Sequence, residues 1–286
     1  MTTTTATATP ATPPAPTTPP APTLFSNLWW LVSDTITLTR RNLLAVARIP
    51  EALFFSTIQP IMFVLLFRFV FGGAIQTDAS SYVNYLMPGI FVQTVAFGAV
   101  STSIGLAEDL QKGIIERFRA LPMSRGAVLL GRTTADLIRN MFVVIIMTVV
   151  GLLVGFRPST GVALYLAGTS LILLFAYALS WGFAIVGLTA PNSETAQVMS
   201  FPLIFPLTFV SAAFVPLASM PSWLQGFATY QPFSVTVSAA RSLMVGAAST
   251  GTGRSTTYWV VQSLAWTLGF LIVFIPLAIR KYRTRT

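Results

Sequence analysis

Residues 163–189 read ALYLAGTSLILLFAYALSWGFAIVGLT, an apolar stretch without one charged side chain. A helix needs about 20 apolar residues to cross the ~30 Å hydrocarbon core of a bilayer, so this stretch is long enough to span a membrane. Such stretches recur along the chain. The predicted spans are residues 52–71, 83–106, 138–156, 163–189, 196–216 and 258–279. Because the apolar runs are continuous, they indicate transmembrane helices and not the short alternating strands of a β-barrel.

The composition agrees with a helical membrane protein. Of 286 residues, 54% are hydrophobic and 9% are charged, whereas about 25% are charged in a typical soluble domain. The chain has no cysteine and no histidine, which excludes disulfides and thiolate chemistry and argues against a metal site. A net charge of +9 is expected at the cytoplasmic lipid surface of a membrane protein, so no nucleic-acid partner is predicted.

The amino-terminal part divides into a tail and a helix. Residues 1–23 consist almost only of Thr, Ala and Pro, which predicts a disordered tail ahead of one transmembrane domain at 24–286. The tail lacks the basic and apolar regions of a signal peptide. Between residues 24 and 52 apolar side chains recur at helical spacing with arginines among them, which predicts a helix in the inner interface. Lipid anchoring and partner contact are both open roles for it.

The basic residues predict the topology. With the amino terminus inside, four of the 17 Lys and Arg residues fall on the outer side or at span ends, which leaves 13 inside. These four are Arg68, Arg157, Arg241 and Arg254. Lys and Arg accumulate in cytoplasmic loops, so both termini are predicted to be cytoplasmic.

The region of the last two spans contains helix breakers. Pro202 and Pro206 predict a kinked or broken fifth span, because each proline removes a backbone hydrogen bond. Residues 217–250 are too interrupted to span and too apolar for an ordinary loop. They predict a re-entrant or interfacial hairpin on the outer side.

Catalytic patterns are missing from the sequence. None of the eight Asp and Glu residues lies in the middle of a predicted span, which argues against ion-coupled carriers and against hydrolases with paired acids. No phosphate-binding loop G-x-x-x-x-G-K-[ST] occurs, so the chain binds no ATP through such a loop. We expect neither an enzyme nor a cofactor or metal in this chain, and any energy for transport must come from a separate subunit.

Residues 108–125 read EDLQKGIIERFRALPMSR and form a charged segment between two spans. Glu108–Lys112 and Lys112–Glu116 are spaced i,i+4, and each such pair stabilises a solvated helix by about 0.2–0.5 kcal/mol. Apolar residues from Leu110 to Leu121 share one helical face, with Phe118 available to a pocket. Charges of both signs favour a protein partner over a lipid surface. The predicted contact residues are Glu108, Asp109, Lys112, Gly113, Glu116, Arg117, Phe118, Leu121, Pro122 and Arg125.

Several stretches match a known family. They include LTRRNL at 38–43, QPIMFVLLF at 59–67, FGGAI at 71–75, YLMPGI at 85–90 and the whole of 108–125. With them, residues 35–285 resemble the membrane subunits of ABC-2 type exporters, and more narrowly the daunorubicin/doxorubicin resistance permeases. One departure is Gln231, which stands where many relatives have Asn before proline.

This resemblance implies an architecture. The fold would be an all-α integral membrane protein of the bacterial cell membrane with six transmembrane helices, an interfacial helix, a cytoplasmic coupling helix at 108–125 and an outer hairpin. Two copies of the chain would work with two ABC ATP-binding subunits, which bind ATP and Mg. Substrate would pass between the two copies along the second and fifth spans. The path candidates on these spans are Phe91, Gln93, Phe97, Phe201, Phe205 and Phe209.

The resemblance also suggests a function. The leading hypothesis is ATP-driven export of an amphipathic, hydrophobic drug such as an anthracycline. Export of a lipid, glycolipid or other metabolite by the same architecture is the alternative, and no basic cluster within the predicted spans points to an anionic lipid. From a different class, a passive channel or membrane scaffold would need no ATPase.

Overall fold

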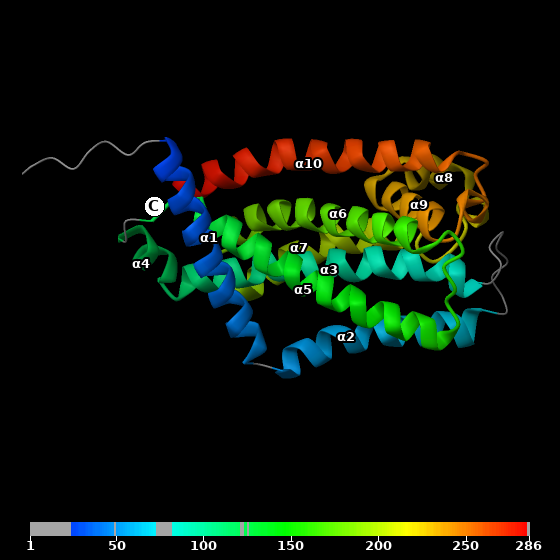
Figure 1. Cartoon of the computed structure of the whole chain (residues 1–286), viewed down its shortest axis with the longest axis horizontal. Helices are drawn as coiled ribbons and strands as arrows, with labels where there is room; N and C mark the ends of the chain where they lie inside the picture. The colour runs from blue at the N-terminus through cyan, green and yellow to red at the C-terminus, as the bar shows by residue number, and fades with distance from the viewer. Residues whose placement is uncertain (1–23, 49, 73–81, 121–122, 125, 285–286) are drawn as a thin grey trace, which may run out of the picture.

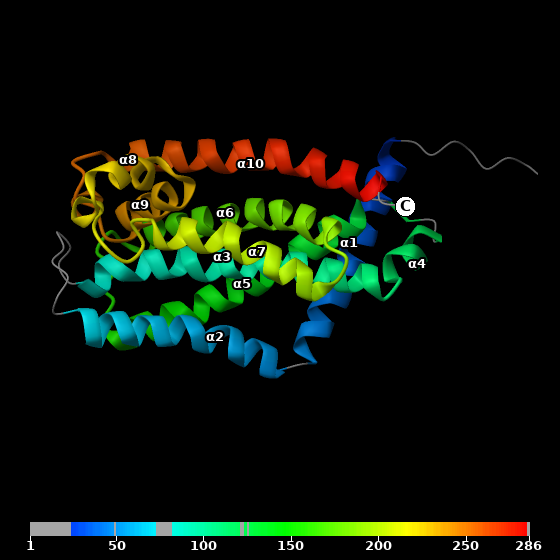
Figure 2. The ribbon, with the colours of Figure 1, turned by 180° about the vertical axis from the view of Figure 1, so that it is seen from behind.

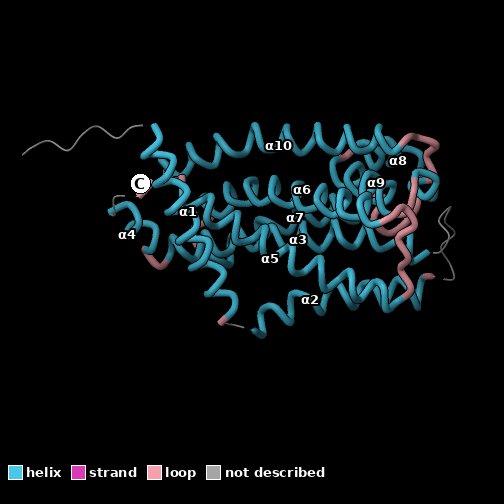
Figure 3. Tube along the Cα trace, in the orientation of Figure 1, coloured by secondary structure: helices cyan, strands magenta, loops and turns pink. Residues whose placement is uncertain are grey.

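The computed structural model describes residues 24–48, 50–72, 82–120, 123–124 and 126–284. Every regular element in these residues is helical (Figure 3), which confirms the predicted all-α class. The predicted tail at 1–23 lies outside the described residues.

An elongated bundle of helices forms the body of the molecule (Figure 1). Its members are α2 (Pro50–Leu65) with the π-helical continuation η1 (Leu66–Phe71), α3 (Tyr82–Gln111), α5 (Ala127–Val154), α6 (Val162–Thr189), α7 (Ser193–Phe209) and α10 (Thr256–Thr284). Among the described residues, α3, α5, α6 and α10 are long and apolar enough to cross a membrane, and α2 with η1 has a shorter apolar part at Thr57–Phe71. Each predicted span therefore overlaps with a helix of the bundle.

Helix α3 forms the centre of the bundle. Nearly all of its residues from Tyr82 to Ala107 are buried, and it packs against α2, α5, α6, α7 and α9. A helix that is apolar on all sides can be buried in this way without exposing a polar face.

Two helices differ in extent from the predicted spans. Helix α5 begins at Ala127, well before residue 138 where the predicted span starts, and the residues between include charged side chains that are paired inside the bundle. Helix α7 continues through Pro202 and Pro206 but ends at Phe209, short of the predicted boundary at 216. Beyond it the backbone is held by side chains of α9, since the Ala212 N–H donates to Ser234 Oγ at 2.9 Å.

The two ends of the bundle differ in character. Helix α1 (Leu24–Ala47) crosses one end, where α4 (Ile114–Ala120) and the carboxyl terminus also lie (Figures 1 and 2). The other end carries η2 (Leu217–Ser219), α8 (Ser222–Tyr230), α9 (Pro232–Met244) and η3 (Ala247–Thr250). The segment predicted as an outer hairpin thus consists of short helices. Of these, α9 is buried and contacts α3, α6 and α10.

Arg241 of α9 lies in the core at this end. The sequence placed it among the outer basic residues, but its exposed fraction is 0%. Its Nε donates to the Tyr85 carbonyl at 2.9 Å and its Nη2 to the Ala212 carbonyl at 2.6 Å. The guanidinium also lies 3.6 Å from the centroid of the Tyr85 ring. Arg241 therefore joins α9 to α3 and to the segment after α7.

Candidate functional site

The sequence predicted one continuous helix for the charged segment 108–125. In the structure this segment is divided between the end of α3 and α4. Helix α3 ends at Gln111, and Gly113 has φ +65° before α4 begins at Ile114. This left-handed conformation is open to glycine and reverses the chain direction locally. The Lys112–Glu116 pair is therefore not formed, whereas Lys112 Nζ lies 2.5 Å from Glu108 Oε1. The hydrogen bond with Glu108 raises the pKa of Lys112 above its ordinary value.

Helix α4 is anchored on one face and exposed on the other. Ile115 is buried, and Phe118 is half-buried in the same apolar cluster. Arg41 of α1 lies over the Phe118 ring at 5.1 Å and forms an ion pair with Asp109 at 2.8 Å. Phe118 thus contacts its own chain, and less of it is available to a partner than the sequence suggested. Glu116 and Arg117 are exposed.

Three residues predicted for this contact lie outside the described residues, namely Leu121, Pro122 and Arg125. A side chain of α1 holds the backbone just before α5, because the Ser124 N–H donates to Asp34 Oδ2 at 3.0 Å. The surface that α4 presents, with Glu116 and Arg117 exposed, is termed the α4 surface below.

A cavity of about 440 Å³ lies beside this end of the bundle, between α1, α2, α3, α5 and α7. Three of the predicted path residues line it, namely Gln93, Phe97 and Phe201. The others do not. Phe91 is fully buried in the core against Phe156, and Phe205 stacks on Phe209 at 4.3 Å outside the cavity.

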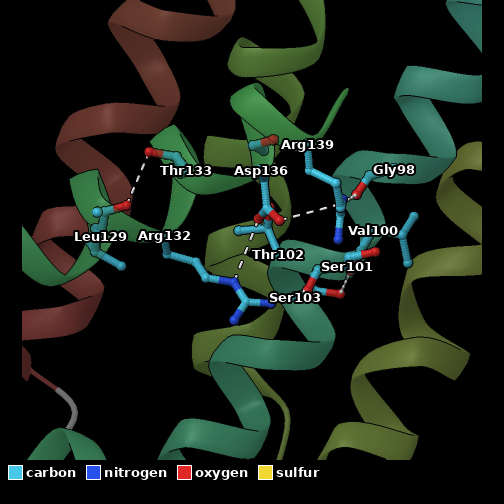
Figure 4. A network of polar contacts seen from close by, with 12 residues as sticks. Gly98, Val100, Ser101, Thr102, Ser103, Leu129, Arg132, Thr133, Asp136 and Arg139 are labelled. Atoms are coloured by element: carbon cyan, nitrogen blue, oxygen red, sulfur yellow. Dashed lines mark hydrogen bonds and ion pairs between the residues drawn. The ribbon is translucent and has the colours of Figure 1, made fainter. Parts of the chain in front are cut away.

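One wall of the cavity carries a charge cluster in which Asp136 is buried and two arginines are partly buried (Figure 4). Asp136 Oδ2 accepts a hydrogen bond from Thr102 Oγ1 at 2.5 Å. Arg132 Nε lies 3.5 Å from Asp136 Oδ2, and Arg139 Nη2 lies 3.2 Å from Asp136 Oδ1. Each arginine also donates to a carbonyl of α3, Arg132 to Ser101 at 2.9 Å and Arg139 to Gly98 at 2.6 Å. One carboxylate therefore faces two guanidinium groups.

Sequence reasoning missed this cluster. It started the third span at residue 138, and it found no basic cluster within the spans. In the structure Arg132 and Arg139 both belong to α5 and line the cavity. A signal was present: Arg132, Asp136 and Arg139 are spaced i, i+4 and i+7, which places them on one helical face.

Small residues of α3 make room for this wall. A Cβ atom at Gly105 would lie 1.8 Å from Arg132 Nη2, and one at Gly98 would lie 2.2 Å from Asn140 Oδ1. Both distances are far below van der Waals contact, so any larger residue would displace the polar side chains of α5.

Comparison with known proteins agrees with this architecture. Residues 33–245 match the family model described as ABC-2 type transporter. The chain is 32% identical to the daunorubicin resistance ABC transporter permease protein DrrB1 of Streptomyces coeruleorubidus, over 89% of this chain and 87% of that protein. It is 28% identical to the probable doxorubicin resistance ABC transporter permease protein DrrC of Mycobacterium tuberculosis, over 89% and 90%. It is 25% identical to the putative transport permease ycf38 of Cyanophora paradoxa, over 86% and 83%. With its apolar helices and this match, the chain is a multi-pass membrane protein that belongs to the ABC-2 type transporter family.

Proposed function

We propose that this chain is the membrane-spanning subunit of an ATP-driven exporter of amphipathic, hydrophobic compounds. Permeases of this family are non-catalytic transport subunits that work with separate ABC ATP-binding subunits. The observation that carries the proposal is the α4 surface, a short helix with exposed charges fixed to the end of the central helix α3.

The assembly would contain two copies of this chain and two ATP-binding subunits, which hold ATP and Mg. All six bundle helices would span a bacterial plasma membrane, with both termini on the cytoplasmic side and α8 and α9 forming the outer hairpin. The charge distribution supports this orientation, since α1, α4, the start of α5 and the end of α10 share one end and carry most of the Lys and Arg residues.

Movement of α4 would couple ATP binding to transport. Helix α3 connects the α4 surface to the cavity, because its residues Gln93 to Glu108 line the cavity and its last turn leads through Gly113 into α4. A displacement of α4 by the ATPase would therefore act directly on a cavity wall.

The substrate would be a drug such as an anthracycline, as the names of the two resistance permeases suggest. Lipid export is the second candidate, and the partly buried arginines of the cavity wall favour it.

Affinity capture tests the proposal. The full chain, purified in mild detergent with its bound proteins, should bring down an ATPase subunit in about equal amount. ATPase activity of the captured material identifies that subunit. A homo-oligomer without any ATPase would contradict the exporter and favour a passive channel.

The turn at Gly113 should be essential for that capture. A Gly113→Ala substitution places a Cβ in a left-handed conformation that costs about 1–2 kcal/mol, so the presented position of α4 becomes about 5–30-fold less populated. Capture of the ATPase should fall by a similar factor.

Gly126→Ala is the matched control. Gly126 also flanks the segment, but it has φ −76° and a Cβ there would meet Leu31 at 3.8 Å, which is ordinary contact. Equal loss of the ATPase in both variants would show that the conformation of Gly113 is not the cause.

A further inference from the structure

We propose that the cavity beside α3 and α5 binds the polar end of an anionic amphiphile, with a carboxylate or phosphate at the arginine wall and an apolar body against phenylalanines. The inference rests on the proposed function and favours its second candidate, a lipid or other anionic amphiphile, over an anthracycline, whose amino sugar is cationic at neutral pH; the binding itself requires only this chain.

The charge of the wall is the first argument. Arg132 and Arg139 share the single carboxylate of Asp136, which also accepts from Thr102. The other carboxylate that lines the cavity, Glu108, pairs with Lys112. These groups leave one excess positive charge, and no described carboxylate of the wall is free for a cationic ligand. In a site of low dielectric such a charge favours an anion strongly.

Unused donors of the wall are the second argument. Asn140 is 2% exposed, and its Nδ2 has no hydrogen-bond partner among the described residues. Arg132 Nε likewise has its ion pair at 3.5 Å but no hydrogen bond. A buried donor without a partner is destabilising. Both residues line the cavity, so acceptor oxygens of a ligand would satisfy these donors once the side chains turn toward it, whereas an ammonium group, which only donates, would satisfy neither.

The apolar side of the cavity fits the rest of such a ligand. Phe63, Phe97 and Phe201 line it, and the rings of Phe97 and Phe201 lie 6.1 Å apart in a tilted arrangement. Along α3, Phe97 directly precedes Gly98, whose carbonyl accepts from Arg139, so the aromatic rings lie beside the arginine wall. This arrangement fits an amphiphile whose apolar body lies next to its charged end.

The space at the wall is maintained by glycine. Gly98 and Gly105 of α3 lie against Asn140 and Arg132, and a Cβ at either position would clash with these side chains, so the glycines provide the room that the polar side chains of the wall occupy. The proposed site therefore combines charge, free donors and room.

Three pyrene probes test the inference, since they share one aromatic body and differ in the polar end: pyrenebutyrate, pyrenebutanol and pyrenebutylamine. The full chain in nanodiscs of zwitterionic lipid is titrated by fluorescence anisotropy, and empty nanodiscs give the background. Pyrenebutyrate should bind at least about tenfold more tightly than pyrenebutylamine, the factor expected for one charge-assisted hydrogen bond. Equal binding, or tighter binding of the amine, would overturn the inference.

Two variants locate the site. Arg139→Gln should reduce binding of pyrenebutyrate about tenfold and remove the preference, and Asn140→Leu should weaken it several-fold without touching the ion pairs. Arg157→Gln, at the opposite end of α5, is the control and should bind as the native chain does. A preference for the acid that survives in both Arg139→Gln and Asn140→Leu would place the binding elsewhere.

The capture in detergent and the titration in nanodiscs together separate this inference from the proposed function. Capture of an ATPase without any preference for the acid would refute the anion site and leave the exporter intact. A preference for the acid without capture of an ATPase would support the anion site and contradict the exporter.

Discussion

Glu116→Arg is expected to remove ATP-driven export almost completely. Glu116 is exposed in the first turn of α4, so its carboxylate is available to a basic group of the ATPase. Reversing a charge at such a contact creates repulsion of about 2 kcal/mol or more, which weakens binding roughly 30-fold or more. The measurement is substrate export from inside-out vesicles together with ATPase activity, and export should fall much more than the amount of permease in the membrane.

The matched control is Glu194→Arg. Glu194 is also an exposed carboxylate in the first turn of a helix, α7, so both substitutions disturb a helix N-terminus equally. Only the variant in α4 should lose coupling. Phe118→Ala should uncouple as well, through loss of its contacts with Arg41 and the apolar cluster. Unchanged export in both Glu116→Arg and Phe118→Ala would refute the docking role of α4.

Arg241→Ala should cause the largest loss of stability of any single substitution considered. The change removes two charge-assisted hydrogen bonds to carbonyls and a stacked guanidinium, and it leaves a void between α9 and α3. We expect a loss of about 2–4 kcal/mol. Thermal unfolding in detergent measures this loss of stability, with the fraction of protein that remains monodisperse as the readout.

Arg254→Ala is the control for that experiment. Arg254 lies at the same end and stacks over Tyr258 at 4.4 Å, but it is only half-buried and bonds no backbone carbonyl among the described residues. Its removal should change stability by less than about 1 kcal/mol. Similar melting of the two variants would mean that burial of Arg241 contributes nothing specific.

The sequence predicted the helical bundle well, because an apolar run of about 20 residues has few alternatives to a spanning helix. It also identified the segment around α4, since charges of both signs between apolar runs are unusual. The turn at Gly113 was missed. The regular i,i+4 spacing of charges suggested a continuous helix, and the spacing of side chains says nothing about one backbone angle.

Buried charge was the other difficulty. The count of basic residues on each side placed Arg132 on the cytoplasmic side and Arg241 on the outer side, and Asp136 was left outside the predicted spans. In the structure these side chains lie within the bundle, where they contact backbone carbonyls or each other. Predicting this requires knowing which helices are neighbours, and a single sequence does not contain that information in its periodicity.

The contacts of Arg41 give α1 a property of its own. Because this arginine binds both Asp109 and the ring of Phe118, α4 cannot shift without pulling α1 or breaking these contacts. The far half of α1 carries Trp29 and Trp30, two exposed indoles 5.2 Å apart. This tryptophan pair is therefore an intrinsic fluorescent probe, and a movement of α4 that pulls α1 would change the tryptophan emission.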